Sequence, residues 1–156
     1  MRGTVMVVRK IRQIGTALIE FTIVAFFYMI IFFTIVDFGV FGYVKLTMQH
    51  AVREGARYAI TGRTDLDPNN SSDRSAAVIA KIDNASDGLL SRVTNTSNIR
   101  VEDIDGNSVA GFGQPRQLIS IHLDCEWPSF SPFIRPFVQN GHYKFTVSSA
   151  MKNEAF

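Results

Sequence analysis

The amino-terminal part of the chain is dominated by one apolar run. No charged side chain occurs from Phe21 to Val36, and the apolar character continues beyond Asp37 through residues 38–44. A helix needs roughly 20 apolar residues to cross the hydrocarbon core of a bilayer, and the run reaches this length once residues 17–19 are counted. The pattern therefore predicts a membrane-spanning helix, with lipid as a partner.

A secretory signal peptide is the first alternative for such a run. Its apolar region would be about 7 to 15 residues long and would end at a small-x-small cleavage site. Here the run is longer and continues into helix-forming sequence. We therefore expect the anchor to be retained rather than removed.

Beyond Val44 the pattern becomes that of an amphipathic helix, because apolar residues recur at helical spacing and no proline occurs from Thr16 to Ile60. Small residues four positions apart would form a narrow face that another helix, or the chain's own sheet, could approach closely. These small residues are Ala51, Gly55 and Ala59. The opposite side carries Arg53, Glu54 and Arg57, which we interpret as a solvated face.

A single helix over residues 16–61 would be about 70 Å long at about 1.5 Å per residue. This is more than twice the roughly 30 Å thickness of the hydrocarbon core, so its second half must project from the bilayer. A partly apolar helix outside lipid needs a packing partner.

The remaining residues, 62–156, predict a second helix and several strands. Thr61 and Gly62 are typical of a helix end, residues 65–73 are typical of an exposed loop, and Asp73 is a candidate cap for a second helix. That helix would carry an apolar stripe interrupted near Gly88. The stripe consists of Ala76, Ile79, Ile82, Leu89, Leu90 and Val93.

Strand patterns follow the second helix, with a tight turn at Asp105-Gly106. The apolar positions that alternate with polar ones are Ile99 and Val101, then Ile119, Ile121, Leu123 and Cys125, and finally Tyr143, Phe145 and Val147. The predicted fold class is α+β: a long amino-terminal helix, membrane-spanning and then amphipathic, a second helix and a small antiparallel sheet.

Before the last strand, three prolines interrupt an aromatic stretch from Trp127 to Phe137. Outside the membrane, this stretch could cover the sheet or form a contact surface for other proteins. Covering the sheet is the favoured interpretation.

Charge gives the direction of insertion. The basic residues before the apolar run have no acidic residue among them, and such a flank normally stays in the cytoplasm, so the domain that follows is expected outside it. These basic residues are Arg2, Arg9, Lys10 and Arg12. The formal net charge of +2 argues against nucleic acid as a partner.

Residue types used in catalysis occur near the predicted second strand. His122 and Asp124 would share one face of that strand, whereas Cys125 would point to the other and is most simply a core residue. His142 lies at the start of the last strand. No phosphate-binding loop, paired-cysteine motif or nucleophile elbow is present, so we predict no catalytic site, no metal site and no cofactor.

The junction between the basic leader and the apolar run carries the most specific chemistry. A protease at the cytoplasmic membrane face needs a small, flexible residue such as Gly15 at the scissile bond, and cleavage there would make Thr16 the new amino terminus. Glu20 would then lie one helical turn away, where it could pair with that amine or with a neighbouring subunit's. The alternative is an ordinary single-span anchor, with Glu20 near the positive end of the helix dipole.

The junction resembles the cleavage site of type IV prepilins, because Gly15 is followed five residues later by the pair Glu20-Phe21. Asp37-Phe38-Gly39 and the block Ala-Val-Arg-Glu-Gly-Ala-Arg-Tyr-Ala at residues 51–59 resemble the TadE-like pseudopilins of tight-adherence (Flp-type) pili. The tail at residues 150–154 is similar to the basic-Asn-Glu ending of that family. Phe26 is a departure, because the family often has a proline there, and a straighter helix is expected.

This resemblance implies a pilin-like fold and a minor, non-catalytic pilus component. It implies processing by a prepilin peptidase between Gly15 and Thr16, with Glu20 and Phe21 acting in assembly. Other pilin-like subunits and pilus assembly proteins would be its partners, at the bacterial inner membrane and in a surface pilus.

The chain is thus expected to consist of a basic leader at 1–15, a helix at 16–61 and an extracytoplasmic α+β domain at 62–156. An unprocessed single-span membrane protein whose outer domain binds a ligand or partner is the alternative.

Overall fold

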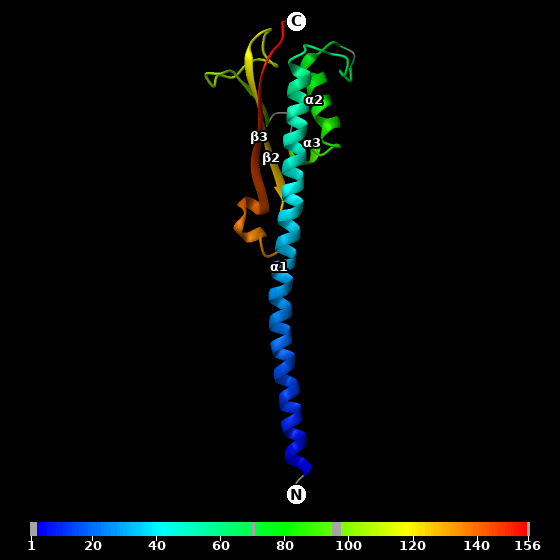
Figure 1. Ribbon diagram of the computed structural model, residues 1–156, viewed down its shortest axis with the longest axis vertical. Coiled ribbons are helices and arrows are strands. Elements are labelled where there is room, and N and C mark those ends of the chain that lie inside the picture. The colour runs from blue at the N-terminus through cyan, green and yellow to red at the C-terminus, as the bar shows by residue number, and fades with distance from the viewer. Residues whose placement is uncertain (1–2, 70, 95–97, 156) are drawn as a thin grey trace.

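The computed structural model describes residues 3–69, 71–94 and 98–155, with side chains described from residue 15 onward (Figure 1). One long helix, α1 (Gly3–Ala59), runs nearly the whole length of the molecule. The other elements gather around its carboxyl-terminal half. They are α2 (Arg74–Ala85), α3 (Leu90–Val93), β1 (Ile99–Glu102), β2 (Leu118–Pro128), the 3-10 helices η2 (Arg135–Phe137) and η3 (Gln139–Gly141), and β3 (His142–Lys152).

Helix α1 continues without a break past Phe26, as expected for a chain that lacks a proline there. It ends at Ala59, two residues before the predicted end, in a turn in which Gly62 has a φ of 68°. The positive φ explains why glycine follows the helix, since residues with a Cβ are strained in this conformation.

The strands form one antiparallel sheet in the order β1-β2-β3, with Ile121 of β2 opposite Val101 of β1 and Ser149 of β3. The alternation predicted for β2 is confirmed. Its odd-numbered residues from Ile119 to Cys125 are buried, and the polar residues between them are partly exposed. The fold is α+β, as predicted.

Helix α2 begins where the sequence places its cap, because the Asp73 carboxylate accepts a hydrogen bond from the Ser75 backbone N–H at 2.8 Å. It ends before Gly88, whose N–H donates to the Asp83 carbonyl. The predicted apolar stripe is confirmed in part and is rotated over α2. Its members Ile82, Leu90 and Val93 are buried, but Ala77 and Val78 are buried as well, and the predicted members Ala76 and Ile79 are only partly buried.

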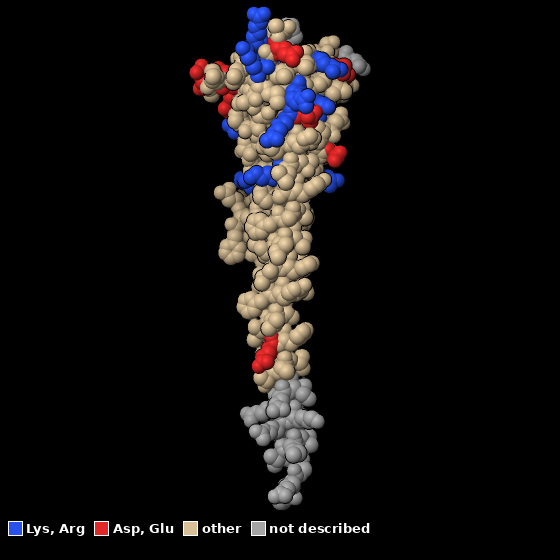
Figure 2. Space-filling model, viewed as in Figure 1, with Lys and Arg blue, Asp and Glu red and all other residues tan. Residues whose placement is uncertain are grey.

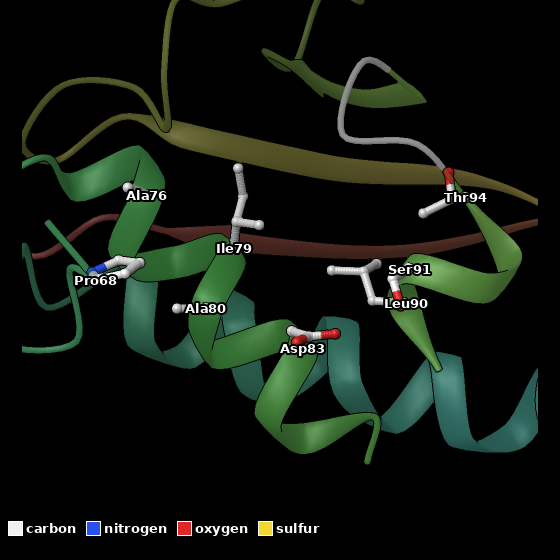
Figure 3. A pocket seen from close by; sticks show the side chains of 8 residues that line it. All are labelled: Pro68, Ala76, Ile79, Ala80, Asp83, Leu90, Ser91 and Thr94. Carbon is white, nitrogen blue, oxygen red and sulfur yellow. The ribbon is translucent and has the colours of Figure 1, made fainter. Parts of the chain in front are cut away.

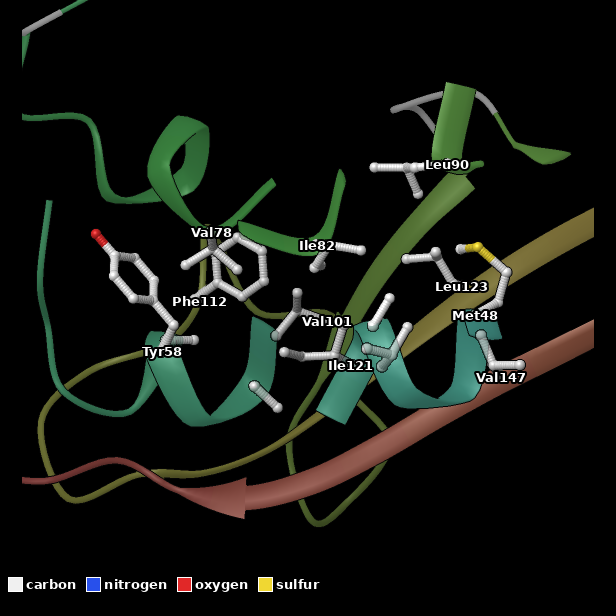
Figure 4. Close-up of a cluster of buried hydrophobic side chains, with 14 of the residues drawn as sticks. Met48, Tyr58, Val78, Ile82, Leu90, Val101, Phe112, Ile121, Leu123 and Val147 are labelled. Carbon is white, nitrogen blue, oxygen red and sulfur yellow. The ribbon is translucent and has the colours of Figure 1, made fainter. Parts of the chain in front are cut away.

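The core lies between the carboxyl-terminal half of α1, helices α2 and α3, and the apolar face of the sheet (Figures 1 and 4). Figure 4 shows Met48 and Tyr58 of α1, Val78 and Ile82 of α2, and Ile121 of β2 in one cluster. Other buried residues of α1 recur at helical spacing: Val44, Ala51, Val52, Ala56 and Ala59. The amphipathic half of α1 is therefore covered by the chain's own elements.

Candidate functional site

The amino-terminal half of α1 presents an uncovered apolar surface. We call residues 15–36 the apolar stalk, and the described residues from Asp37 onward the head. No side chain of the apolar stalk is buried, and Phe21 is 70% exposed. Figure 2 shows this surface almost free of charge. In the sequence, Glu20 is the one charged residue of positions 15–36.

The length and composition of this helix suit a membrane. Within the described residues, Gly15–Ala59 is the helix that is long and apolar enough to cross a bilayer, and its most apolar window has no buried residue. A core helix of a soluble protein would instead be largely buried. Residues 15–36 alone would span about 33 Å at about 1.5 Å per residue, close to the hydrocarbon thickness.

The two threonine hydroxyls in the middle and upper part of the apolar stalk are satisfied without water. Thr22 Oγ1 donates to the Leu18 carbonyl at 2.8 Å, and Thr34 Oγ1 donates to the Ile30 carbonyl at 2.7 Å. Such bonds to the preceding helical turn let threonine lie in an apolar medium without an unpaired hydroxyl hydrogen.

The junction residues lie together on the lowest described turns of the apolar stalk. Gly15 is exposed, and a Cβ added to it would meet no atom within 4 Å, so its backbone is open to approach. Thr16 and Glu20 are four positions apart, the spacing at which helical side chains are neighbours. Among the described residues, Glu20 has no hydrogen bond or ion pair, and Phe21 points into open surroundings.

Asp37 marks the upper end of the apolar stalk and is only 2% exposed. Its carboxylate accepts hydrogen bonds from Ser129 Oγ at 2.7 Å, from the Phe130 backbone N–H at 2.8 Å and from the Tyr143 hydroxyl at 2.8 Å. These donors come from the β2 to β3 connection and from β3. The carboxylate thus fastens this connection to α1, a role that the sequence did not assign to it.

The small-residue face of α1 meets helix α2 of the same chain. Ala51 and Ala59 are fully buried. At Gly55, a Cβ would collide with Ile82 Cγ1 and lie 2.9 Å from Ile82 Cδ1. The absence of a side chain at Gly55 is therefore what lets Ile82 rest on the backbone of α1.

A buried clasp joins the end of α1, the start of α2 and the carboxyl-terminal tail. Its centre is the Arg74 guanidinium, whose acceptors include the carbonyls of Ala59, Phe112 and Gly113 and the side-chain oxygen of Asn153, at 2.7 to 3.3 Å. Asn153, 2% exposed, also donates to the carbonyls of Phe112 and Gln114. A cation at the carboxyl end of α1 is favoured by the helix dipole as well as by these bonds.

The residues of catalytic type on the strands are not assembled into a catalytic arrangement. His122 Nε2 lies 3.7 Å from Glu102, and Asp124 pairs with Arg100, on the polar face of the sheet. Cys125 is buried on the other face, and desolvation raises the pKa of its thiol to about 12, so it is protonated at neutral pH. No cluster of potential metal ligands occurs in the described part of the chain.

An open groove lies between α2 and α3 on the outer side of the head (Figure 3). Ala76 and Ile79, which the sequence predicted for the core stripe, line this groove together with Leu90. Their place explains the rotated stripe: because α2 turns Val78 and Ile82 toward α1 and the sheet, its neighbouring apolar residues face outward.

These features define a protein with one helix able to span a membrane and an α+β head packed on the far half of that helix. A family model described as TadE-like protein matches residues 15–57. Over this segment the chain is similar to TadE-like proteins, in agreement with the resemblance seen in its junction and its Arg-Glu-Gly-Ala-Arg block. The matched segment begins at Gly15, contains the apolar stalk and ends at Arg57.

No curated protein and no solved structure matches the chain. The family match and the apolar stalk together indicate a membrane protein associated with tight-adherence pili.

Proposed function

We propose that this chain is a non-catalytic pseudopilin that a prepilin peptidase cleaves after Gly15. It then acts with other pilin-like subunits and pilus assembly proteins to build a tight-adherence type IV pilus or an allied secretion system. The observation that carries this proposal is Glu20: an acidic side chain without a described partner, on an exposed apolar helix, five residues after an accessible glycine.

The position of Glu20 favours assembly over a solitary anchor. A carboxylate within a bilayer is costly unless it is paired, with costs of about 2.5 kcal/mol or more on insertion scales. Cleavage after Gly15 would create a cation at Thr16, four positions away on the same helix. The amine of the same chain or of a neighbouring chain would then pair with Glu20, and the apolar stalk would pack sideways against other apolar helices.

The direction of insertion follows from the charges on the two sides of the apolar stalk. The basic leader stays in the cytoplasm, so the head stands in the periplasm. The charged residues of the head surface gather at the end farthest from the apolar stalk (Figure 2), which suits an aqueous location. From the inner membrane the processed chain would enter the base of a growing pilus.

Cleavage is tested by the intact mass of the chain purified from cells that contain the peptidase. We expect the loss of Met1 to Gly15, and we expect Gly15→Leu to abolish that loss because the bulky side chain does not fit at the scissile bond. Gly39→Leu is the matched control, since Gly39 also lies on α1 with no atom within 4 Å of an added Cβ. A full-length mass for the unmodified chain would instead favour an unprocessed single-span protein.

The role of Glu20 is tested separately from cleavage. Glu20→Ala should be cleaved normally but should reduce piliation at least about tenfold, the effect expected when about 1.4 kcal/mol of pairing energy is lost. Glu54→Ala, on the same helix but in the head, removes only a surface pair to Arg57 at 3.6 Å and should leave piliation unchanged. Normal piliation by Glu20→Ala would remove the carboxylate from the assembly mechanism.

A further inference from the structure

The connection between β2 and β3, residues 129–141, forms a projection that we call the foot loop. It lies beyond the end of the sheet and against α1, on the side of the head that faces the apolar stalk (Figure 1). The Phe133 ring meets the Phe26 ring edge to face, with centroids 6.0 Å apart. The expectation that this aromatic stretch covers the sheet is therefore wrong, because it extends the head down along α1.

The outer surface of the foot loop carries large apolar side chains, whereas its exposed polar side chains are Arg135, Gln139 and Asn140. Phe130 is 64% exposed and Phe137 is 86% exposed, and Pro132 and Pro136 are exposed beside them. No aspartate or glutamate occurs in residues 127–153. Exposed aromatic side chains of this kind in a soluble domain indicate an interaction surface.

The depth of the foot loop follows from its contact with the apolar stalk. A hydrocarbon core takes roughly 20 helical residues, so a window of α1 that begins between residues 14 and 21 ends between residues 33 and 40. In every such placement Phe26 lies at least seven residues, or about 10 Å, inside the outer end of the window. The ring of Phe133 beside it is therefore below the outer edge of the hydrocarbon.

The backbone of the foot loop is suited to this environment, in which unpaired polar groups are costly. Two of its positions are prolines, which have no N–H. Its backbone N–H groups with acceptors in the loop or on Asp37 are those of Ser129, Phe130, Ile134, Arg135, Phe137 and Gly141. Hydrogen bonds among the described residues thus pair at least six of the eleven backbone N–H groups of the loop.

The one arginine of the foot loop is directed toward the head. A Cβ at Gly141, the residue before β3, would lie 3.0 Å from Cγ and Nε of Arg135, so the arginine stem folds back over this glycine. A guanidinium held at the upper end of an apolar loop is placed to reach lipid phosphates while its stem stays in apolar surroundings.

We propose that the foot loop inserts into the outer leaflet of the bilayer, with Phe130 and Phe137 in the hydrocarbon and Arg135 at the level of the headgroups. Interfacial elements bury their apolar faces by about 5–10 Å, and the depth of Phe133, at least about 10 Å, lies at or beyond the deep end of that range. Lipid is favoured over another protein because the foot loop is continuous with the apolar stalk. This inference requires only that the apolar stalk spans the membrane, and it is independent of cleavage and of Glu20.

The test uses depth-dependent fluorescence quenching of the full chain in phosphatidylcholine and phosphatidylglycerol vesicles, at low protein density. Trp127 is the only tryptophan, and its indole nitrogen has no hydrogen-bond partner among the described residues, so Trp127→Phe provides a background without that signal. In this background, Phe137→Trp places the probe on the foot loop. Ile104→Trp is the matched control, because Ile104 is 76% exposed in the turn after β1, far from the apolar stalk.

We expect Phe137→Trp to lose most of its emission to lipids that carry a nitroxide near the headgroup end of the acyl chain, and to be shielded from aqueous iodide. Ile104→Trp should show the reverse. Equal quenching of the two variants by iodide would overturn the proposal. Shielding that develops only as the protein density in the vesicles rises would overturn it too, since the occupant would then be a neighbouring chain.

Discussion

Gly55→Leu is expected to lower the free energy of unfolding of the head by about 3 kcal/mol or more. The first atom of the new side chain already overlaps Ile82 Cγ1, and Ile82 is fully buried. A β-branched residue on a helix has essentially one χ1 rotamer, so Ile82 has no alternative position. Chemical denaturation in detergent, followed by the near-ultraviolet circular dichroism of the aromatic residues, measures the loss.

The smaller substitution isolates the contact from other effects. Gly55→Ala adds only the Cβ, and Ile82→Ala removes both atoms with which it collides, at a cost of about 2–5 kcal/mol by itself. The double variant should therefore be more stable than the sum of the two changes predicts, by about 1–3 kcal/mol. Additive effects would show that α2 does not rest on Gly55.

The control for Gly55 is another glycine of the same helix. Gly42 has no atom within 4 Å of an added Cβ. Gly42→Ala should therefore stabilise the chain by up to about 1 kcal/mol through helix propensity alone. Gly55→Ala should thus lower the free energy of unfolding and Gly42→Ala should raise it. This difference in sign distinguishes a packing requirement at Gly55 from a general effect of glycine in helices.

The features that the sequence predicts well are those encoded by neighbouring residues. The apolar run needs only composition, the cap of α2 needs only Asp73 and the helix that follows it, and β2 needs only strict alternation. The family follows from short motifs on one helix. In each case the determining interactions lie within a few positions along the chain, so no knowledge of the tertiary arrangement is required.

The features that the sequence predicts poorly depend on distant partners. The stripe of α2 is rotated because the position of α1 decides which apolar residues turn inward, and periodicity alone cannot choose between adjacent faces. Asp37 draws its three donors from residues 129–143. A solitary carboxylate at the end of an apolar run was nevertheless a signal that buried partners would be needed.

Arg74 also carried a signal that could be read from the sequence. It occupies the first position of α2, where the helix dipole disfavours a cation. A basic residue at such a position needs compensation from elsewhere, and here that compensation comes from the end of α1 and from the tail. The clasp therefore joins three segments whose association cannot be deduced from any one of them.

Arg74→Ala is expected to lower the free energy of unfolding by about 3 kcal/mol, since it leaves buried carbonyl oxygens without their donor and each such loss costs about 1–3 kcal/mol. The acceptors affected include the carbonyls of Ala59, Phe112 and Gly113. Arg74→Lys should recover only part of the loss, because an ammonium group cannot reproduce the planar fork of a guanidinium. Denaturation in detergent measures both changes.

Arg63→Ala is the matched control at the same end of the head. Arg63 forms an exposed pair with Asp65 at 2.9 Å, and surface pairs contribute less than about 1 kcal/mol. The clasp also predicts coupling with the tail. Once Arg74 is alanine, Asn153→Ala should cost less than it does in the unmodified chain, because the two side chains bond to each other and share the Phe112 carbonyl as an acceptor. Equal losses for Arg74→Ala and Arg63→Ala, without coupling to Asn153, would show that the tail is held by other contacts.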